Sequence, residues 1–574
     1  MNTPTCGLAA LSRPRFLDAA LVVCLAVAAF APALRNGFTY DDELVVSDNP
    51  GLSGLLSPGA YFTRDYFALS GETTWRPLAT LSYALDYRAW GANPFGYHLT
   101  NLLWHAAASV LFLALCLSLG AERRVAAAAA CLYAVHPIQS EAVCAIGFRE
   151  DLQCSAFYFA ALALWPTLRS AGGELRRHVR AAASVICFIL AMLSKEMAFS
   201  FPLMVLLKEA LQGRSRLPGV TQTDDAQSVS FSASRDVTKR LESRSAGVTS
   251  LWLAVVVLLT GFFLGLPRFF SAPSAPPNPY TGVPLFVRLA AFPAIAVRYL
   301  RLLAVPWPLS VERIVVMEGA AFWVSSALSA IALLAVGALA WAAARRFAAG
   351  LQAFIAFLVL LAPVSNIVPI YNPMAERYLV LPCAAFCWAA AQGGGLVGGQ
   401  WTGWTRWTGW TKWALVVALL GGAVALDWRR AADWRSPEAL WGGVVAAESR
   451  SPRALLNYGL AMTEAGKPET ALPALLRARD LSPGDVRVLN TLGWTLNNLQ
   501  RYAEAKDALD RALRQAPDFG PAHLNMTVTC VGLGDLNGAR FHARRAAALM
   551  PQSAAARGNL ARLDAMEGGV NRGS

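Results

Sequence analysis

The sequence predicts an all-α protein, a polytopic membrane helix bundle of about eleven helices followed by a soluble α-solenoid of tetratricopeptide repeats. The first observation behind this prediction is composition. Hydrophobic residues make up 55% and charged residues only 15% of the 574 residues, which is too apolar for an ordinary soluble protein. The second is a change after Asp427, where the sequence becomes polar and alanine-rich and repeats with a period of about 34 residues.

The expected membrane domain covers residues 1–430. A spanning helix needs about 20 mostly apolar residues, and somewhat fewer inside a bundle. Such segments lie at residues 16–34, 99–119, 124–138, 151–168, 180–194, 197–211, 250–267, 319–343, 349–370, 377–394 and 413–427. A further apolar segment, 285–305, carries Arg288, Arg298 and Arg301 at helical spacing, which favours a helix lying partly in the membrane interface. We expect the first segment to be a retained helix and not a cleaved signal.

The basic residues predict the orientation of the helices. Arg13 and Arg15 precede the first span, which places the N-terminus in the cytoplasm and the loop 35–98 on the non-cytoplasmic side. Alternation then places the basic loop 212–249 in the cytoplasm. If segment 285–305 is interfacial, residues 372–377 fall on the same side as loop 35–98, and if it spans they fall on the other side. The tryptophan-rich tract 401–413 is expected to be a cytoplasmic connector with interfacial anchors.

The C-terminal part, residues 436–570, is expected to be the repeat domain. The period of about 34 residues is that of tetratricopeptide repeats, in which small residues stand where paired helices cross and proline ends the second helix. We expect three repeats and part of a fourth over residues 452–565, forming a groove for a protein partner. The repeated positions are Pro483, Pro517 and Pro551; Ala478, Ala512 and Ala546; Ala471, Ala505 and Ala539; and Gly459 with Gly493.

Charge and cysteine usage exclude two classes of function. The formal net charge is +13, but the basic residues are scattered between apolar segments, which is a topology pattern and not a nucleic-acid surface. The 10 cysteines form no CxxC motif and no cysteine/histidine ligand pattern, so neither a disulfide framework nor a zinc site is expected.

Chemistry-bearing residues gather at helix ends that the predicted topology places outside. Asp41 and Asp42 follow the first span, where a carboxylate with a raised pKa can act as a general base. Taken singly, each of the other charged residues fits a helix cap or an interfacial ion pair. Together on one side of the membrane they indicate a site. The candidate substrate-binding residues are Arg76, His136, Glu141, Arg149, Asp151, Lys195, Glu196, Glu376 and Arg377.

A series of short motifs, in their order along the chain, resembles the transmembrane and tetratricopeptide-repeat protein O-mannosyltransferase family. The resemblance covers nearly the whole chain. It departs from the family pattern where Phe148 replaces a glycine, and the repeat array is short. The motifs are Tyr40-Asp41-Asp42, Trp75-Arg76-Pro77-Leu78, Gly96-Tyr97-His98-Leu99 with Asn101 and His105, residues 136–143, Arg149-Glu150-Asp151-Leu152, Ser194-Lys195-Glu196, residues 299–310 and residues 375–382.

The resemblance implies a glycosyltransferase of the C superfold. Such an enzyme takes mannose from a polyprenyl-phosphate carrier and attaches it to Ser or Thr of a protein on the non-cytoplasmic side. Asp41 would be the base, and the repeats would recruit the acceptor or a partner. Direct displacement would invert the anomeric centre. The use of a divalent metal stays open.

Two alternatives to this activity remain from the sequence. One is a related enzyme that glycosylates a lipid or a polysaccharide. The other is a non-enzymatic transporter or scaffold with a repeat adaptor. Transporters place charges near the middle of the membrane and often contain internal repeats of their helices. The acids lie at helix ends here, which favours the enzyme.

Overall fold

The computed structural model describes residues 13–53, 57–63, 66, 74–167, 173–214, 250–265, 280–344, 347–400, 409–448 and 450–570. Every regular element in these residues is helical, which confirms the predicted all-α class. The chain divides into two compact units. The first comprises residues 1–311 and 315–435, and the second comprises 312–314 and 436–574. The predicted cytoplasmic loop beyond Arg214 and the tryptophan tract at 401–408 lie outside the described residues.

The first unit contains helices at the predicted spans, a helix within the predicted external loop 35–98 (Pro77–Trp90), a short helix (Ser140–Cys144) and the helix expected to be interfacial (Leu285–Ala304). They are α1 (Arg13–Phe30), α4 (Pro77–Trp90), α5 (Pro94–Ser118), α6 (Arg123–Ala134), α7 (Ser140–Cys144), α8 (Arg149–Leu164), α9 (Glu174–Ser194), α10 (Phe201–Arg214), α13 (Leu285–Ala304), α14 (Gly319–Ala343), α15 (Ala348–Leu361), α16 (Val380–Gln400) and α17 (Gly409–Asp433). The short elements are η1 (Ala31–Arg35), η2 (Glu43–Ser47), α2 (Pro50–Ser53), η3 (Pro58–Phe62), η4 (Pro137–Gln139), η5 (Ile146–Phe148), η6 (Glu196–Ser200), η7 (Ala362–Val364) and η8 (Glu376–Leu379).

Each predicted span falls on a helix of this unit or on the helix Ser250–Gly265. In the described part of the chain, four helices are long and apolar enough to cross a bilayer by themselves: Phe16–Arg35, Pro94–Ser118, Glu174–Ser194 and Gly319–Ala343. Two shorter apolar helices are Ser250–Gly265 and Ala348–Val364. These apolar helices support a membrane protein, and the total of about eleven crossings stays a prediction.

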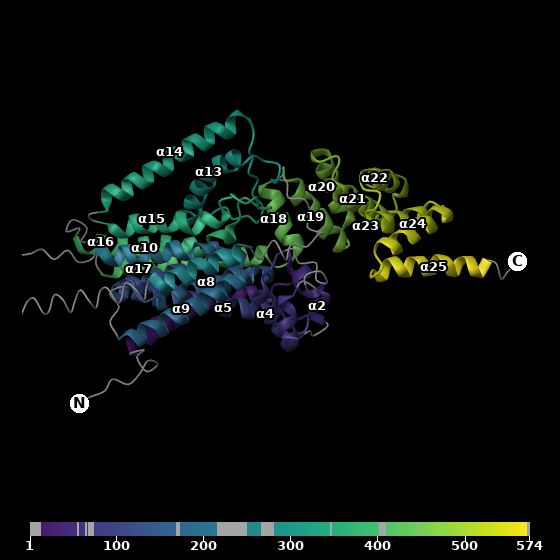
Figure 1. The fold of residues 1–574 in the computed structure, drawn as a ribbon. Coiled ribbons are helices and arrows are strands. Elements are labelled where there is room, and N and C mark those ends of the chain that lie inside the picture. Colours follow the sequence, from purple (N-terminus) through teal and green to yellow (C-terminus); the bar gives the residue numbers. More distant parts are fainter. Residues whose placement is uncertain are drawn as a thin grey trace, which may run out of the picture. The chain divides into compact units, whose positions relative to one another are not determined.

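Helices α5, α8 and α9 run side by side in the bundle (Figure 1). Large aromatic side chains fill the space between α5, α6 and α8: the rings of Phe112, Tyr133 and Phe159 have centroids 5.3 to 5.6 Å apart. Local sequence signals set where the helices begin. Pro77 and Pro94 open α4 and α5, and Asn93 caps α5 by accepting from the backbone N–H of Phe95. Because α8 begins at Arg149, its charged first turn lies at the end of a largely apolar helix.

The second unit is a solenoid of paired helices. After α18 (Pro437–Ala447) come three helical hairpins and a last helix: α19 (Pro452–Glu464) with α20 (Pro468–Leu481), α21 (Val486–Asn498) with α22 (Tyr502–Gln515), α23 (Gly520–Gly532) with α24 (Leu536–Leu549), and α25 (Ala554–Val570). Small residues are required where the paired helices cross, because the helices pack too closely there for a larger side chain. A Cβ at Gly459 would lie 2.4 Å from Leu475, and one at Gly493 would lie 2.5 Å from Leu509.

Candidate active site

The loop after the first membrane helix is pinned by Asp42. This side chain is fully buried, and its two carboxylate oxygens accept hydrogen bonds from the backbone N–H groups of Gly147 at 2.7 Å and Thr39 at 3.0 Å. Gly147 lies between the short helix α7 and the start of α8, so the bond joins the loop to the charged end of α8. Burial raises the pKa of the Asp42 carboxyl to about 7, although the two N–H groups act to lower it.

Asp41 is exposed beside this buried anchor. The residue before it, Tyr40, has a φ of 60°, a left-handed conformation that is uncommon for a non-glycine residue and often marks a functional site. The Tyr40 ring packs at 5.5 Å from Phe148 and 6.4 Å from Trp434. The turn therefore directs two adjacent carboxylates differently: one into the fold and one to the surface.

A second group of charges surrounds the first turn of α8. Arg76, which precedes α4, contacts Glu150 at 2.6 Å and Glu196 at 2.8 Å. Lys195 lies 2.5 Å from Asp151 and 3.6 Å from Glu150. Lys195 and both α8 acids are buried, whereas the Arg76 side chain is 21% and that of Glu196 44% exposed. Arg76 and Glu196 therefore form the accessible edge of this group.

Arg377 extends the site from η8. Its guanidinium contacts Glu141 at 2.6 Å, and its backbone N–H donates to the other oxygen of the same carboxylate at 2.8 Å. The guanidinium also lies over the rings of Phe148 at 4.1 Å and Tyr378 at 5.1 Å. Since Phe148 also contacts Tyr40, the arginine, the aromatic residue and the Asp41 turn are neighbours.

Glu376 connects the site to the end of α17. Its carboxylate is fully buried, accepts from the backbone N–H of Ser310 at 2.5 Å and lies 3.5 Å from Arg430. Arg430 also pairs with Asp433 at 3.2 Å. Glu376 is thus held within the fold by Arg430. Arg430 could contact a substrate only if it released Glu376.

The polar atoms of Arg149 and His136 bind other parts of the fold. Arg149 is fully buried and binds Asp86 at 2.6 Å, Asn101 at 2.7 Å and the backbone carbonyl of Tyr97 at 3.0 Å. His136 accepts from the backbone N–H of Ile138 at one ring nitrogen and faces the Leu303 carbonyl, 3.0 Å away, at the other. Both residues lie near the site, but their polar atoms bond to the segments that surround it.

The structure brings together most residues that the sequence analysis selected. Asp41, Asp42, Arg76, Asp151, Lys195, Glu196 and Arg377, with Glu141 and Glu376 behind them, belong to the contact groups above. Lys195 and Arg377 join these groups, because both lie over the Tyr378 ring, at 5.8 and 5.1 Å from its centroid. Sequence reasoning missed Phe148 as a contact of Arg377, and Arg430 and Trp434 at the end of α17. It also missed Gly147, whose role depends on its backbone N–H, the donor to the Asp42 carboxylate.

The arrangement can support transfer to a hydroxyl group. It offers an exposed carboxylate that can take a proton and nearby cations that can neutralise an anionic leaving group. In the described residues, no group of three or more His, Cys, Asp or Glu side chains is placed to hold a metal ion. The acids around α8 instead pair with Arg76 and Lys195.

The fold and the site together define a helical membrane protein with a tetratricopeptide-repeat unit. A family model described as "Tetratricopeptide repeat" matches residues 462–526, which confirms the predicted repeats. The match runs from α19 into α23.

Curated relatives confirm the family resemblance. The chain is 25% identical over 562 residues to "Protein O-mannosyl-transferase TMTC3" of Mus musculus, covering 92% of this chain and 59% of that protein. It is 24% identical to the Homo sapiens protein of the same name, covering 91% of this chain and 58% of that one. "Protein O-mannosyl-transferase Tmtc1" of Drosophila melanogaster is 30% identical over 297 residues, 49% of this chain and 32% of that protein. The chain thus spans about three fifths of the length of the two TMTC3 proteins.

Two of the solved structures that match the chain resemble it only distantly. The first tetratricopeptide-repeat domain of human RPAP3 matches 21% of this chain and 97% of its own at 16% identity, with a TM-score of 0.20. The crystal structure of the APC/C hetero-tetramer Cut9-Hcn1 matches 88% of this chain and 98% of its own at 14% identity, with a TM-score of 0.22. TM-scores this low support no argument about the fold.

Proposed function

We propose that this chain is an inverting membrane glycosyltransferase that moves mannose from a polyprenyl-phosphate donor to Ser or Thr of a protein on the non-cytoplasmic side. The names of the curated relatives support mannose and a protein acceptor. The membrane setting supports a lipid-linked donor, because a carrier whose tail stays in the bilayer presents its sugar phosphate at helix ends. The candidate site lies at such ends, around the first turn of α8.

The observation that carries this proposal is the separation of roles between Asp41 and Asp42. The Asp42 carboxylate is buried and holds the loop through the backbone N–H groups of Gly147 and Thr39. Asp41 lies on the exposed side of the same turn. A general base must reach a substrate proton directly or through one water, so Asp41 is the base and Asp42 fixes its position.

In the proposed reaction, the Asp41 carboxylate takes the proton of the acceptor hydroxyl. The hydroxyl oxygen forms a bond to the anomeric carbon while the bond from that carbon to the phosphate oxygen breaks. The electron pair of this bond leaves with the polyprenyl phosphate, and the anomeric configuration is inverted. No further reactant is needed, because the phosphate is already a competent leaving group.

The cations of the site stabilise the departing phosphate. Arg76 has the most exposed side chain of the three, whereas Lys195 and Arg377 are held by Asp151 and Glu141 at the back of the site. Such preorganised charges act where negative charge develops in the transition state. We propose that all three face the donor phosphate and that the paired acids keep them in place.

The repeat unit has a separate role in the proposal. Tetratricopeptide solenoids present extended concave surfaces that bind other proteins or peptides. The three hairpins from α19 to α24 are sufficient for such a surface. We propose that they hold the acceptor protein or a partner that brings it.

The activity is tested by transfer of radiolabelled mannose from a polyprenyl-phosphate donor to endogenous proteins, in membranes with and without the chain. We expect labelled protein only with the chain. Label that appears only in lipid or polysaccharide would favour the related lipid-linked enzyme. No transfer to any acceptor, with the chain well expressed and several sugars offered, would favour a non-enzymatic role.

The base is tested by comparing Asp41→Asn and Asp42→Asn. Asp41→Asn should lower single-turnover transfer by about 10² to 10⁴ with normal membrane abundance, because loss of a general base costs about that much. Asp42→Asn should lower both transfer and abundance, because its amide places a donor against a backbone N–H. Asp48→Asn, an exposed substitution in the same loop, is the control. If Asp41→Asn transfers at the wild-type rate while Asp42→Asn is inactive but abundant, the assignment is wrong by one residue.

A further inference from the structure

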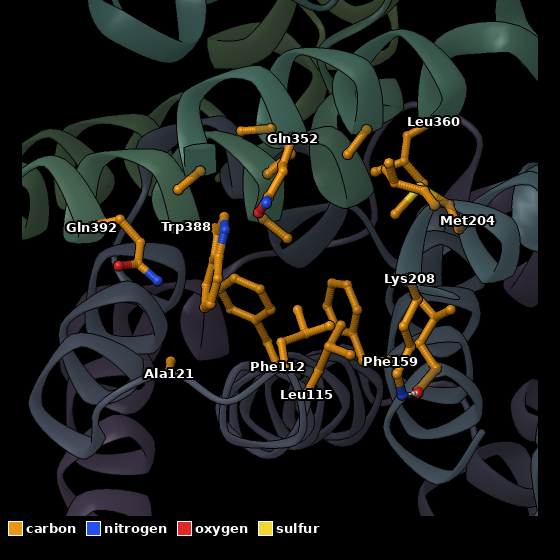
Figure 2. Close-up of a pocket in the computed structure, with 18 of the residues that line it drawn as sticks. Phe112, Leu115, Ala121, Phe159, Met204, Lys208, Gln352, Leu360, Trp388 and Gln392 are labelled. Carbon is orange, nitrogen blue, oxygen red and sulfur yellow. Dashed lines mark hydrogen bonds between the residues drawn. The ribbon is translucent and has the colours of Figure 1, made fainter. Parts of the chain in front are cut away.

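An apolar cavity of about 410 Å³ lies inside the membrane unit, lined by α5, α8, α10, α15 and α16. Its walls include Phe112, Phe159, Met204, Ala353 and Trp388. Figure 2 shows Phe112, Leu115 and Phe159 on one side of the space, with Trp388 and Gln352 extending into it from the other. The volume falls within the range of about 300–1,000 Å³ that is usual for small-molecule sites.

The cavity is separate from the candidate active site. On α8, Tyr158 of the cavity wall follows Asp151 of the site by seven residues, which is about 10 Å along a helix. On α5, the wall begins at Phe112, eleven residues after Asn101, or about 16 Å. The cavity therefore occupies the half of the bundle that lies away from the charged end of α8.

Lys208 is a buried cation at the edge of this cavity. It is 4% exposed, and its ammonium donates to the carbonyls of Leu162 and Trp165 at the end of α8, as Figure 2 shows for one of these bonds. No carboxylate in the described residues pairs with it. An ammonium group has three N–H donors, so one donor remains for another group. A buried cation at membrane depth usually pairs with an anion or with backbone carbonyls, or faces a water-filled cavity.

The same end of the bundle is basic. Arg180 reaches the Ala163 carbonyl at 3.4 Å, beside the carbonyls that bind Lys208. The charged residues at this end, in the part of the chain that the structure describes, are Arg123, Arg124, Arg176, Arg177, Arg180 and Lys208, against Asp18, Glu122, Glu174 and Glu209. Cations exceed acids, and basic pockets between membrane helices bind anionic head groups.

We propose that the cavity binds one hydrocarbon chain of an anionic bilayer phospholipid, whose phosphate lies at the Lys208 end. The apolar walls match the chain, and the excess of cations matches the phosphate. The lipid enters from the leaflet opposite the candidate active site, so it is a different molecule from the sugar donor. This inference does not depend on the proposed transferase activity.

The test uses the full chain in vesicles with phosphatidylglycerol that carries a photoreactive group in its acyl chain. We expect crosslinks on α15 or α16. Ala385→Phe, which fills the cavity from α16, should lower crosslinking about tenfold, the change given by a loss of about 1.4 kcal/mol. Ala390→Phe is the matched control, because Ala390 is exposed on the same helix. Ala353→Phe fills the cavity from α15. It serves as the second cavity-filling variant if Ala385→Phe does not fold.

Three results would overturn the proposal. The first is equal crosslinking in the wild type, Ala385→Phe and Ala353→Phe. The second is equal crosslinking by phosphatidylcholine that carries the same photoreactive acyl chain, which would show that the site does not recognise an anionic head group. We expect a preference for phosphatidylglycerol, and Lys208→Gln should abolish it. The third is competition by unlabelled polyprenyl phosphate but not by unlabelled phosphatidylglycerol, which would assign the cavity to the sugar donor.

Discussion

Asp42 combines full burial with two backbone donors, and these act on its pKa in opposite directions. Burial is the larger effect and raises the pKa from 3.8 to about 7. The folded state therefore binds the proton more tightly than the unfolded state, and stability falls as pH rises from about 4 to about 7. Below 3.8 both states are protonated, and above about 7 both are ionised, so the stability contribution of Asp42 is constant outside this window.

This predicts a pH-dependent stability that Asp42→Asn removes. The purified wild type should melt at a higher temperature at about pH 5 than at about pH 8, and Asp42→Asn should show a smaller difference, because an amide does not titrate in this range. Asp48→Asn should keep the wild-type difference. An unchanged difference in Asp42→Asn, measured by thermal unfolding in the same detergent, would assign the titration to another group.

Arg377 and Glu141 form a buried pair whose members depend on each other. Glu141 is fully buried and Arg377 nearly so, and leaving one buried charge without its partner costs about 3–5 kcal/mol. We predict that Arg377→Ala lowers membrane abundance and that Arg377→Ala with Glu141→Ala restores part of it. Arg377→Lys should keep abundance but weaken use of the donor, because lysine lacks the planar group that lies over Phe148. Normal abundance of Arg377→Ala, measured by quantitative blotting, would contradict this coupling.

At the residue scale, the sequence identified the kinds of residue in the site better than their partners. Charges at apolar helix ends were sufficient to select Arg76, Lys195 and Arg377. The pairing of Arg377 with Glu141 spans 236 positions and follows from packing of η8 against α7, which no local pattern encodes. The anchor of Asp42 is a backbone N–H, and such a donor is present at almost every residue, so the sequence could not single out Gly147.

At the element scale, two of the three turns within the helical hairpins of the repeat unit contain a glycine with positive φ, and the third contains a glutamine. The helix pairs α19–α20 and α23–α24 are joined through Gly466 and Gly534, with φ of 71° and 79°. The corresponding position between α21 and α22 is Gln500, with φ of 58°. A residue with a Cβ pays about 1–2 kcal/mol for this left-handed conformation, whereas glycine adopts it readily.

Gln500→Gly should therefore stabilise the solenoid. The relief of strain is reduced by the greater freedom of glycine in the unfolded chain, so we expect a gain of about 0.5–1 kcal/mol. The measurement is chemical or thermal unfolding of the full chain followed by a probe in the repeat unit. Gln515→Gly, near the end of α22, is the control and should destabilise by up to about 1 kcal/mol. Destabilisation by both substitutions would show that the Gln500 side chain makes a contact worth more than the strain.

The end of α17 shows what a sequence pattern cannot supply. The sequence predicts it as the last membrane span, but its final turns also hold α1 and the start of the Asp41 loop. Trp428 donates to the Ala28 carbonyl at 2.8 Å, and Asn36 donates to the Ala431 carbonyl at 3.1 Å. These contacts join segments about 400 residues apart in the chain. Apolar content predicted the helix, but the loop that it supports follows only from the three-dimensional packing.

For the whole molecule, the number of membrane crossings decides which compartment each part faces. If α13 (Leu285–Ala304) is interfacial, an even number of spans separates the Asp41 loop from the repeat unit, and both lie on the non-cytoplasmic side. If α13 spans, they lie on opposite sides. Arg298 and Arg301 are exposed on α13, and exposed arginines are expensive in the hydrocarbon region. This favours the interfacial position.

The predicted topology is tested with single cysteines and an impermeant thiol reagent on intact cells. Ser47→Cys reports on the Asp41 loop and Ser482→Cys on the repeat unit, while Ser228→Cys reports on the predicted cytoplasmic loop. Ser47 is exposed, whereas nearby Thr39 is fully buried and would escape labelling on either side. We expect both Ser47→Cys and Ser482→Cys to react above the background of the unsubstituted protein, and Ser228→Cys to react only after lysis. Reaction of Ser482→Cys only after lysis would mean that the spans after the Asp41 loop are odd in number, and it would place the repeats away from the proposed acceptor site.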